Sequence, residues 1–221
     1  MDKDRDNKAT FYIEPSRIQD WTDGIFAFAM TLLIVSVDIP NLESPVTEEK
    51  LSGALVGMMP TFLTFIMSFV LIAIFWMVHH KQFQSIKKSN DALLWINVAL
   101  MLLVVFMPFT TDLIDDYSNF KIANFVFNLN MFFIGAMFYL QYSYSSSHGL
   151  FDERISMEHI SHYKRQNSAI AVVSLIALIA GLLSPIYSSY LYLLIPIYIV
   201  YINKTRKLQT KYQERSIYGR R

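Results

Sequence analysis

The sequence contains no cysteine and has few charged residues. The absence of cysteine excludes disulfide frameworks, thiolate chemistry and cysteine-based metal sites. Charged residues make up 17% of the 221 residues, whereas 53% are hydrophobic and 15% aromatic. A soluble domain of this length can bury a core, but it does not need unbroken apolar runs as long as a bilayer is thick.

Recognisable enzyme motifs are also missing. The chain has no Walker motif, no His-Glu-x-x-His pair and no glycine-rich phosphate loop. Three serines at 145–147 precede His148, but they lack the context of a nucleophile elbow. The middles of the apolar runs are almost wholly aliphatic or aromatic, so we predict a protein that is not an enzyme.

What the chain does have is a series of runs long enough to span a membrane. A spanning helix needs roughly 20 mostly apolar residues. We identify six such runs, at about 22–39, 54–78, 92–114, 122–143, 168–186 and 188–203. The last two are short and meet at Ser184 and Pro185, so the runs alone also allow five spans.

The positive charges favour six spans with both termini in the cytoplasm. This topology puts 17 of the 19 lysines and arginines inside, in segments 1–20, 79–91, 144–167 and 204–221, and leaves only Lys50 and Lys121 outside. Positive residues concentrate on the cytoplasmic side of membrane proteins, and this split requires an even number of spans. We therefore predict an all-α, polytopic protein of the cell (plasma) membrane.

Three regions follow from this topology. Residues 1–16 form a polar leader, 17–203 the six-helix transmembrane domain, and 204–221 a basic cytoplasmic tail. The tail is adjacent to the last span, so we expect it to contact the anionic inner leaflet rather than nucleic acid.

The first span carries two chemically different faces. Asp23 lies within its first turns, where a carboxylate facing lipid is unfavourable. At 100° per residue it lies about 140° around the helix from Phe28, whose stripe continues through Thr31, Leu32 and Val35. Periodicity alone leaves open whether this stripe lines a pore or only packs against a neighbouring helix.

Other polar and aromatic residues are expected at the same membrane level as Asp23. Buried polar groups in a membrane must bond to one another, so we predict a network of Arg17, Asp23, His79 and Asn97. Trp76 and Trp95 lie nearby in the sequence. A solvated position for His79 at the membrane interface is an open alternative.

Metal binding has little support. His79 and His80 are adjacent and point in different directions on a helix. His159 and His162, beside Glu158, have a suitable spacing but lack a third ligand. We predict no metal site.

The predicted outer loops are acidic. These loops contain seven acidic residues and two lysines, a net of five negative charges per chain. In an oligomer this surface would concentrate cations, although a positive-inside topology leaves acids outside in any case.

Four segments together resemble the TMEM175 family of potassium channels. The family's first-helix signature is an arginine, three residues, then Phe-Ser-Asp. Here it reads Arg17, Trp21, Thr22 and Asp23, with tryptophan and threonine in place of phenylalanine and serine. The other segments comprise Trp76, His79 and Phe83; Leu93, Leu94, Trp95 and Asn97; and Phe106, Pro108, Phe109 and Thr110.

The resemblance implies a potassium-selective channel. Members have six helices per subunit and no ordinary filter sequence, and single-repeat prokaryotic members, whose length this chain matches, form homotetramers around helix 1. The positions at which the family's pore is narrowest correspond to Phe28 and Val35. The hydroxyl that contributes to selectivity in the family corresponds to Thr31, and Leu32 lies on the same wall. K+ is then the permeant ion, with Cs+ and Rb+ as further candidates, and no cofactor is implied.

Two other functions are kept as alternatives. An ion- or proton-coupled secondary transporter is disfavoured because the sequence indicates neither broken helices nor an inverted repeat. A membrane scaffold that transports nothing is the other.

Overall fold

A computed structural model describes residues 13–184, 188 and 191–195, and the described residues are helical with no strand. A single isolated bridge joins Ile86 to Phe151. The helices are α1 (Pro15–Val35), α2 (Glu48–Gly57), α3 (Met59–Ser85), α4 (Asp91–Val105), α5 (Met107–Asp116), α6 (Lys121–Ser147), α7 (Met157–Leu183) and the 3-10 turn η1 (Leu191–Leu193).

Five segments of the described chain are long and apolar enough to cross a membrane. They are α1, α3, the α4–α5 pair, α6, and the Tyr163–Leu183 part of α7. The all-α, membrane-spanning prediction is confirmed. The predicted sixth span at 188–203 lies mostly outside the described residues, as do the tail at 204–221 and most of the leader at 1–16.

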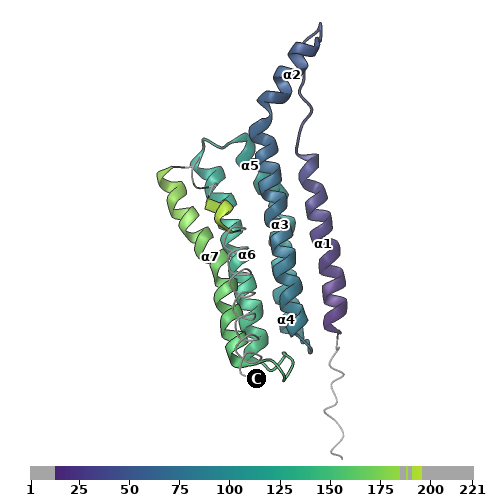
Figure 1. Cartoon of the computed structure of the whole chain (residues 1–221), viewed down its shortest axis with the longest axis vertical. Coiled ribbons are helices and arrows are strands. Elements are labelled where there is room, and N and C mark those ends of the chain that lie inside the picture. The colour runs from purple at the N-terminus through teal and green to yellow at the C-terminus, as the bar shows by residue number, and fades with distance from the viewer. Residues whose placement is uncertain (1–12, 185–187, 189–190, 196–221) are drawn as a thin grey trace, which may run out of the picture.

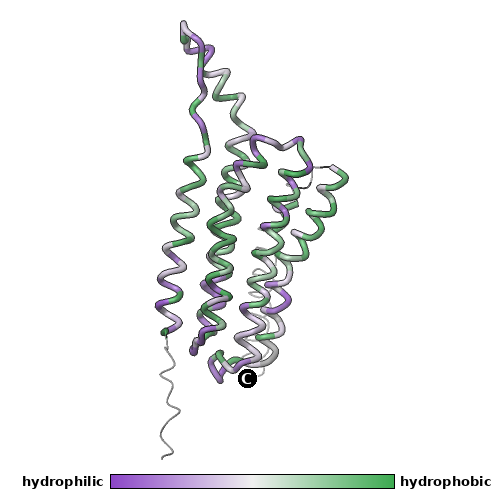
Figure 2. The backbone as a smooth tube through the Cα atoms, turned by 180° about the vertical axis from the view of Figure 1, so that it is seen from behind, coloured by the Kyte–Doolittle hydropathy of each residue, from purple (hydrophilic) through white to green (hydrophobic). Residues whose placement is uncertain are grey.

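The helices form an elongated bundle with α1 at one edge and α6 and α7 at the other (Figure 1). The middle of the bundle is hydrophobic, while polar residues gather towards its two ends (Figure 2). The core between α3, α4 and α6 includes Phe75, Leu100, Phe127 and Phe138, all fully buried. This distribution is that expected of segments whose middles lie in hydrocarbon.

Helix boundaries differ from the predicted ones for local reasons. Pro15 occupies the first turn of α1, where its missing N–H removes no helical hydrogen bond. The Asn90 side chain caps α4 by accepting from the Leu93 N–H at 2.9 Å. The first apolar run was predicted to extend to about residue 39, but α1 already ends at Val35.

The prediction that the spans are unbroken is wrong for the third one. The segment divides at Phe106 into α4 and α5, and Pro108 lies in the first turn of α5. Proline cannot donate the hydrogen bond that a continuous helix requires at this position. The short helix α2, which extends beyond the bundle (Figure 1), was also unforeseen because most of it lies between the first two predicted spans.

Helices α6 and α7 approach each other most closely at Gly135. A β-carbon added there would lie 2.5 Å from the backbone nitrogen of Ala171 and 2.8 Å from its Cα. Backbone atoms cannot move aside as a flexible side chain can, so the two helices would have to separate. Glycine is therefore required by packing at this position.

Replacing Gly135 by alanine is expected to lower the free energy of unfolding by about 1–3 kcal/mol, the usual cost of overpacking. Denaturation of the purified protein in mixed micelles measures this change. Gly53→Ala is the matched control, because a β-carbon there meets nothing within 4 Å. Equal stability of the two variants would contradict the close contact.

Candidate functional site

Helix α1 has one buried face and one exposed face. The buried face consists of Ile18, Thr22, Phe26, Ala29 and Leu33, which pack against the rest of the bundle. These residues follow the spacing of three or four that places side chains on one side of a helix. Helix α1 is thus fixed to the protein along one side only.

The opposite face contains most of the predicted pore residues. Phe28 is 61% exposed and Val35 73% exposed, and Thr31 is exposed between them, while Leu32 lies half-buried at the edge of this face. The exposed positions continue towards the start of the helix through Gly24, Trp21 and Arg17. We call Arg17, Trp21, Gly24, Phe28, Thr31 and Val35 the exposed stripe.

The exposed stripe has the spacing of a helix-association seam. Its members alternate by three and four residues, the heptad pattern with which helices pack around a common axis. In contrast to the buried face, Gly24, Phe28, Thr31 and Val35 are exposed, whereas Arg17 and Trp21 border a cavity that α4 lines on its other side. A face with this pattern is suited to packing against another helix.

A hydrogen-bonded chain behind the stripe joins α1 to α3 and α4. The Asn97 amide donates to the Thr22 hydroxyl at 2.9 Å, and its carbonyl oxygen lies 2.8 Å from His79 Nε2. Because the Asn97 oxygen can only accept, His79 is the donor and carries its proton on Nε2. Thr22 in turn donates to the Ile18 carbonyl at 2.8 Å, and all three side chains are fully buried.

Asp23 forms a separate contact on the α3 side of α1. Trp76 donates its indole N–H to the Asp23 carboxylate at 2.8 Å. One turn earlier, the Gln19 amide lies 2.6 Å from His80 Nδ1. The Asp23 carboxylate therefore has a protein partner, as expected of an acid near the membrane.

Part of the predicted network is thus present and part is absent. The structure brings together His79 and Asn97, adds Thr22 to them, and pairs Asp23 with Trp76. It does not bring Arg17 into this group, because Arg17 lies on the exposed side of α1. The helical positions explain this: Arg17 and Asp23 are six residues apart and face different ways.

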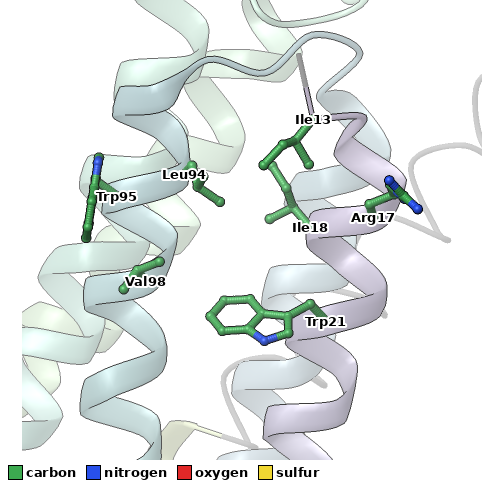
Figure 3. A pocket seen from close by; sticks show the side chains of 7 residues that line it. All are labelled: Ile13, Arg17, Ile18, Trp21, Leu94, Trp95 and Val98. Carbon is green, nitrogen blue, oxygen red and sulfur yellow. The ribbon is translucent and has the colours of Figure 1, made fainter. Parts of the chain in front are cut away.

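Arg17 instead borders a cavity between the starts of α1 and α4. The cavity has a volume of about 290 Å³ and is lined by Ile13, Arg17, Ile18, Trp21, Leu94, Trp95 and Val98 (Figure 3). Its walls are apolar apart from the guanidinium. Trp95, a predicted signature residue, is 71% exposed at its edge.

Two further polar groups within the bundle were missed by the sequence analysis. Thr111 of α5 donates to Ser68 of α3 at 3.0 Å. Near the ends of α6 and α7, Tyr192 donates to Asn128 at 2.7 Å and Ser188 to Asn124 at 2.6 Å. The polar residues of both groups can be recognised in the sequence because they interrupt apolar runs, but the sequence does not show which of them bond to each other.

Charges at the two ends of the bundle are arranged differently. At the end where α5 finishes, Asp112 lies within electrostatic reach of Asp38, Asp115 and Asp116. At the other end, Arg154 donates to Asp152 at 2.7 Å and 3.0 Å. This pairing holds the pKa of the Asp152 carboxyl well below its ordinary value.

Metal binding finds no support in the described part of the chain, where no three histidine, aspartate or glutamate side chains are placed to hold an ion. This part includes His79 and His80. The side chains of His159 and His162 lie outside it.

Comparison with known proteins shows which proteins this chain is similar to. Residues 17–108 match the family model described as endosomal/lysosomal potassium channel TMEM175. A protein from Chamaesiphon minutus named as a potassium channel is 35% identical over 104 residues. Residues 17–108 are thus similar to the TMEM175 family. The matched stretch contains the exposed stripe, the Thr22–Asn97–His79 chain and the Asp23–Trp76 pair.

The fold is similar to that of a TMEM175 homologue over most of the chain. The crystal structure of a TMEM175 homologue from Chamaesiphon minutus, titled a lysosomal potassium-selective channel, matches with a TM-score of 0.71. It covers 84% of this chain and 96% of that one at 24% identity. The zebrafish endosomal/lysosomal proton channel TMEM175 is 26% identical over 86% of this chain but only 37% of its own length.

The chain spans about half the length of the curated bacterial relatives that it matches. The sequence match to the potassium channel from Chamaesiphon minutus covers 47% of this chain and 51% of that protein. A potassium channel from Streptomyces collinus is 31% identical over 47% of this chain and 49% of its own.

Proposed function

We propose that this protein is a potassium-selective channel, formed by four copies around a pore lined by α1, through which K+ passes passively. The observation that carries the proposal is the exposed stripe on α1, which lies opposite a face held to α3 and α4 by buried hydrogen bonds. The names of the bacterial relatives and of the structural match support K+ as the permeant ion.

Symmetry explains how one helix supplies a pore. In a parallel bundle of identical helices, each residue of the stripe meets its counterparts from the other copies at the same level. Phe28, Thr31 and Val35 then form successive rings along one axis. The buried Thr22–Asn97–His79 chain holds each α1 in its orientation without contacting the ions.

Phe28 and Val35 supply a hydrophobic gate in this arrangement. Rings of apolar side chains exclude water, and a hydrated cation meets a barrier there because nothing replaces its hydration shell. Leu32 belongs to the same wall, at its half-buried edge. Phe28 is the bulkiest member, so the gate begins with an aromatic ring.

Thr31 supplies the hydroxyl ring between the two apolar levels. Its O–H donates to the Phe28 carbonyl of the same helix at 2.8 Å, which leaves the oxygen lone pairs available to a cation. A single ring of such oxygens favours K+, the less strongly hydrated ion, over Na+ by a modest factor.

Replacing Thr31 by valine should therefore bring the K+/Na+ permeability ratio towards one, because valine keeps the shape of the side chain and removes the oxygen. Reversal potentials in planar bilayers measure the ratio. Thr64→Val is the control, since the Thr64 hydroxyl of α3 also donates to a carbonyl of its own helix, that of Pro60, at 3.1 Å. An unchanged permeability ratio in Thr31→Val would show that the Thr31 hydroxyl does not select K+ over Na+.

The charge distribution suits a cation pathway. Asp38, Asp112, Asp115 and Asp116 gather at one end of the bundle, where four copies would attract cations and repel anions. Conduction by this route needs no cofactor, and Cs+ and Rb+ are further candidate ions. We assign the chain to the plasma membrane with both termini cytoplasmic.

Flux measurements on reconstituted protein test the proposal against its alternatives. A K+ gradient across proteoliposomes is expected to drive a K+ flux that needs no coupling ion and does not saturate with concentration as carrier transport does. An equal Na+ gradient should drive a smaller flux. Saturable uptake with counterflow would identify a secondary transporter. Absence of any flux from a well-formed oligomer would identify a scaffold.

A further inference from the structure

All three tryptophans of the chain lie at the Pro15 end of the bundle. Trp21 lies in the second turn of α1 and Trp95 in the second turn of α4, and both line the cavity between these helices (Figure 3). Trp76 donates to Asp23, which places its ring at the same level. Tryptophan is enriched where a membrane helix passes from hydrocarbon to the lipid headgroups, so the three rings mark this boundary.

The cavity at this level is apolar and large enough for part of an alkyl chain. Its walls include Ile18 of α1 and Leu94 and Val98 of α4, and Trp95 at its edge is 71% exposed. An apolar cavity of roughly 150 Å³ can hold benzene, and the volume here is about 290 Å³. A chain from the surrounding hydrocarbon can therefore enter beside Trp95.

Arg17 lies one helical turn before Trp21, roughly 5 Å nearer to the end of the bundle. Its stem borders the cavity, while its guanidinium extends outward from α1 (Figure 3). No hydrogen bond or ion pair joins the guanidinium to another side chain in the described part of the chain. Arginine side chains at this depth extend to the headgroup level, and a guanidinium binds two phosphate oxygens at once.

The charges around this end of the cavity balance. Three cations and three acids are exposed there: Arg17, Lys87, Lys88, Glu14, Asp20 and Asp91. Ser89 donates to the Ile13 carbonyl, which holds the turn that carries the two lysines beside the cavity. Because the two signs balance, the rim does not require a lipid of net negative charge. The phosphate that every phospholipid carries is the group that Arg17 can bind.

We propose that the cavity between α1 and α4 is a phospholipid site, in which one acyl chain lies along Leu94 and Val98 and the phosphate binds Arg17. The site is formed by two helices of one chain, so it goes beyond the proposed pore and does not depend on other copies of α1. A lipid held there fixes the spacing between the starts of the two helices.

Quenching of tryptophan fluorescence by a brominated phospholipid tests the site, because bromine on an acyl chain quenches a tryptophan that it contacts. The purified full chain in detergent micelles is titrated with brominated phosphatidylcholine, which should quench Trp21 and Trp95 saturably. Arg17→Gln should raise the half-quenching lipid fraction at least about fivefold through the loss of one arginine–phosphate contact. Arg165→Gln, at an exposed arginine near the start of α7, is the matched control and should leave this fraction unchanged.

Two further arms separate the phosphate from the chain. Brominated diacylglycerol, which has the same chains but no phosphate, should quench weakly and be insensitive to Arg17→Gln. Val98→Phe fills the cavity without altering a charge and should also weaken quenching by the phospholipid. Equal quenching by the two lipids, or an unchanged half-quenching fraction in Arg17→Gln, overturns the phosphate site. Quenching that Val98→Phe leaves intact overturns the cavity as the place of the chain. If Arg17→Gln does not fold, the diacylglycerol and Val98→Phe arms decide.

Discussion

Replacing Phe28 by asparagine is expected to raise the leak of both K+ and Na+ at least about tenfold, which corresponds to a barrier lower by about 1.4 kcal/mol. Phe28 belongs to the exposed stripe of α1 and is itself 61% exposed. In the proposed tetramer, four amide groups at this level would keep water in the constriction. A hydrated ion then passes without losing its shell.

Tracer flux into proteoliposomes measures this leak under a gradient of each ion. Phe133→Asn is a matched control, because Phe133 is a phenylalanine 42% exposed on α6, at the opposite side of the bundle from α1 (Figure 1). The control should show the parental leak. Parental flux in Phe28→Asn as well would place Phe28 outside the pore.

Replacing Asn97 by leucine should lower the free energy of unfolding by roughly 2–4 kcal/mol, combining the penalty for a stranded buried N–H with the lost hydrogen bonds. Asn97 connects Thr22 of α1 to His79 of α3 at 2.9 Å and 2.8 Å. Its removal leaves His79 Nε2 without an acceptor in an apolar environment. The oligomer should also dissociate more readily, because the orientation of α1 is no longer fixed.

A second substitution tests whether the lost His79–Asn97 hydrogen bond causes the destabilisation. His79 stacks on Phe83 with ring centroids 4.4 Å apart and lies 5.9 Å from the ring of Phe26, so a phenylalanine suits the site. Replacing both partners by apolar groups of similar shape removes the stranded donor. His79→Phe with Asn97→Leu should thus be more stable than Asn97→Leu alone, and additive losses in micelle denaturation would rule out the pairing.

The fold was largely predictable because hydrocarbon imposes simple rules. Run lengths and the distribution of lysine and arginine suffice to predict helical spans, and five are found in the described chain. The interruption at Phe106 and the separate helix α2 were missed. Both depend on local backbone geometry near Pro108 and Pro60, which an average over an apolar run does not register.

Helical periodicity predicts which residues share a face of α1, but it does not predict which side chains pair between helices. Periodicity places Phe28, Thr31 and Val35 on one face of α1, whereas their pore-lining role was implied by the family resemblance and stays a prediction. The role of Thr22 as the link from Asn97 to α1, and the separation of Arg17 from Asp23, follow from the packing of three helices. Sequence spacing within a single helix carries no information about such contacts between helices.

The central claim, that the exposed face of α1 lines the ion pathway, can be tested by cysteine modification because the chain has no cysteine of its own. Thr31→Cys is introduced on the exposed stripe, and Ala29→Cys on the buried face, where Ala29 is 0% exposed. A charged, water-soluble thiol reagent is applied while K+ flux is followed, and mass spectrometry counts the labelled sites. The proposed pore predicts that Thr31→Cys loses most of its flux on labelling, whereas Ala29→Cys and the cysteine-free parent do not. Complete labelling of Thr31→Cys with undiminished K+ flux would contradict it.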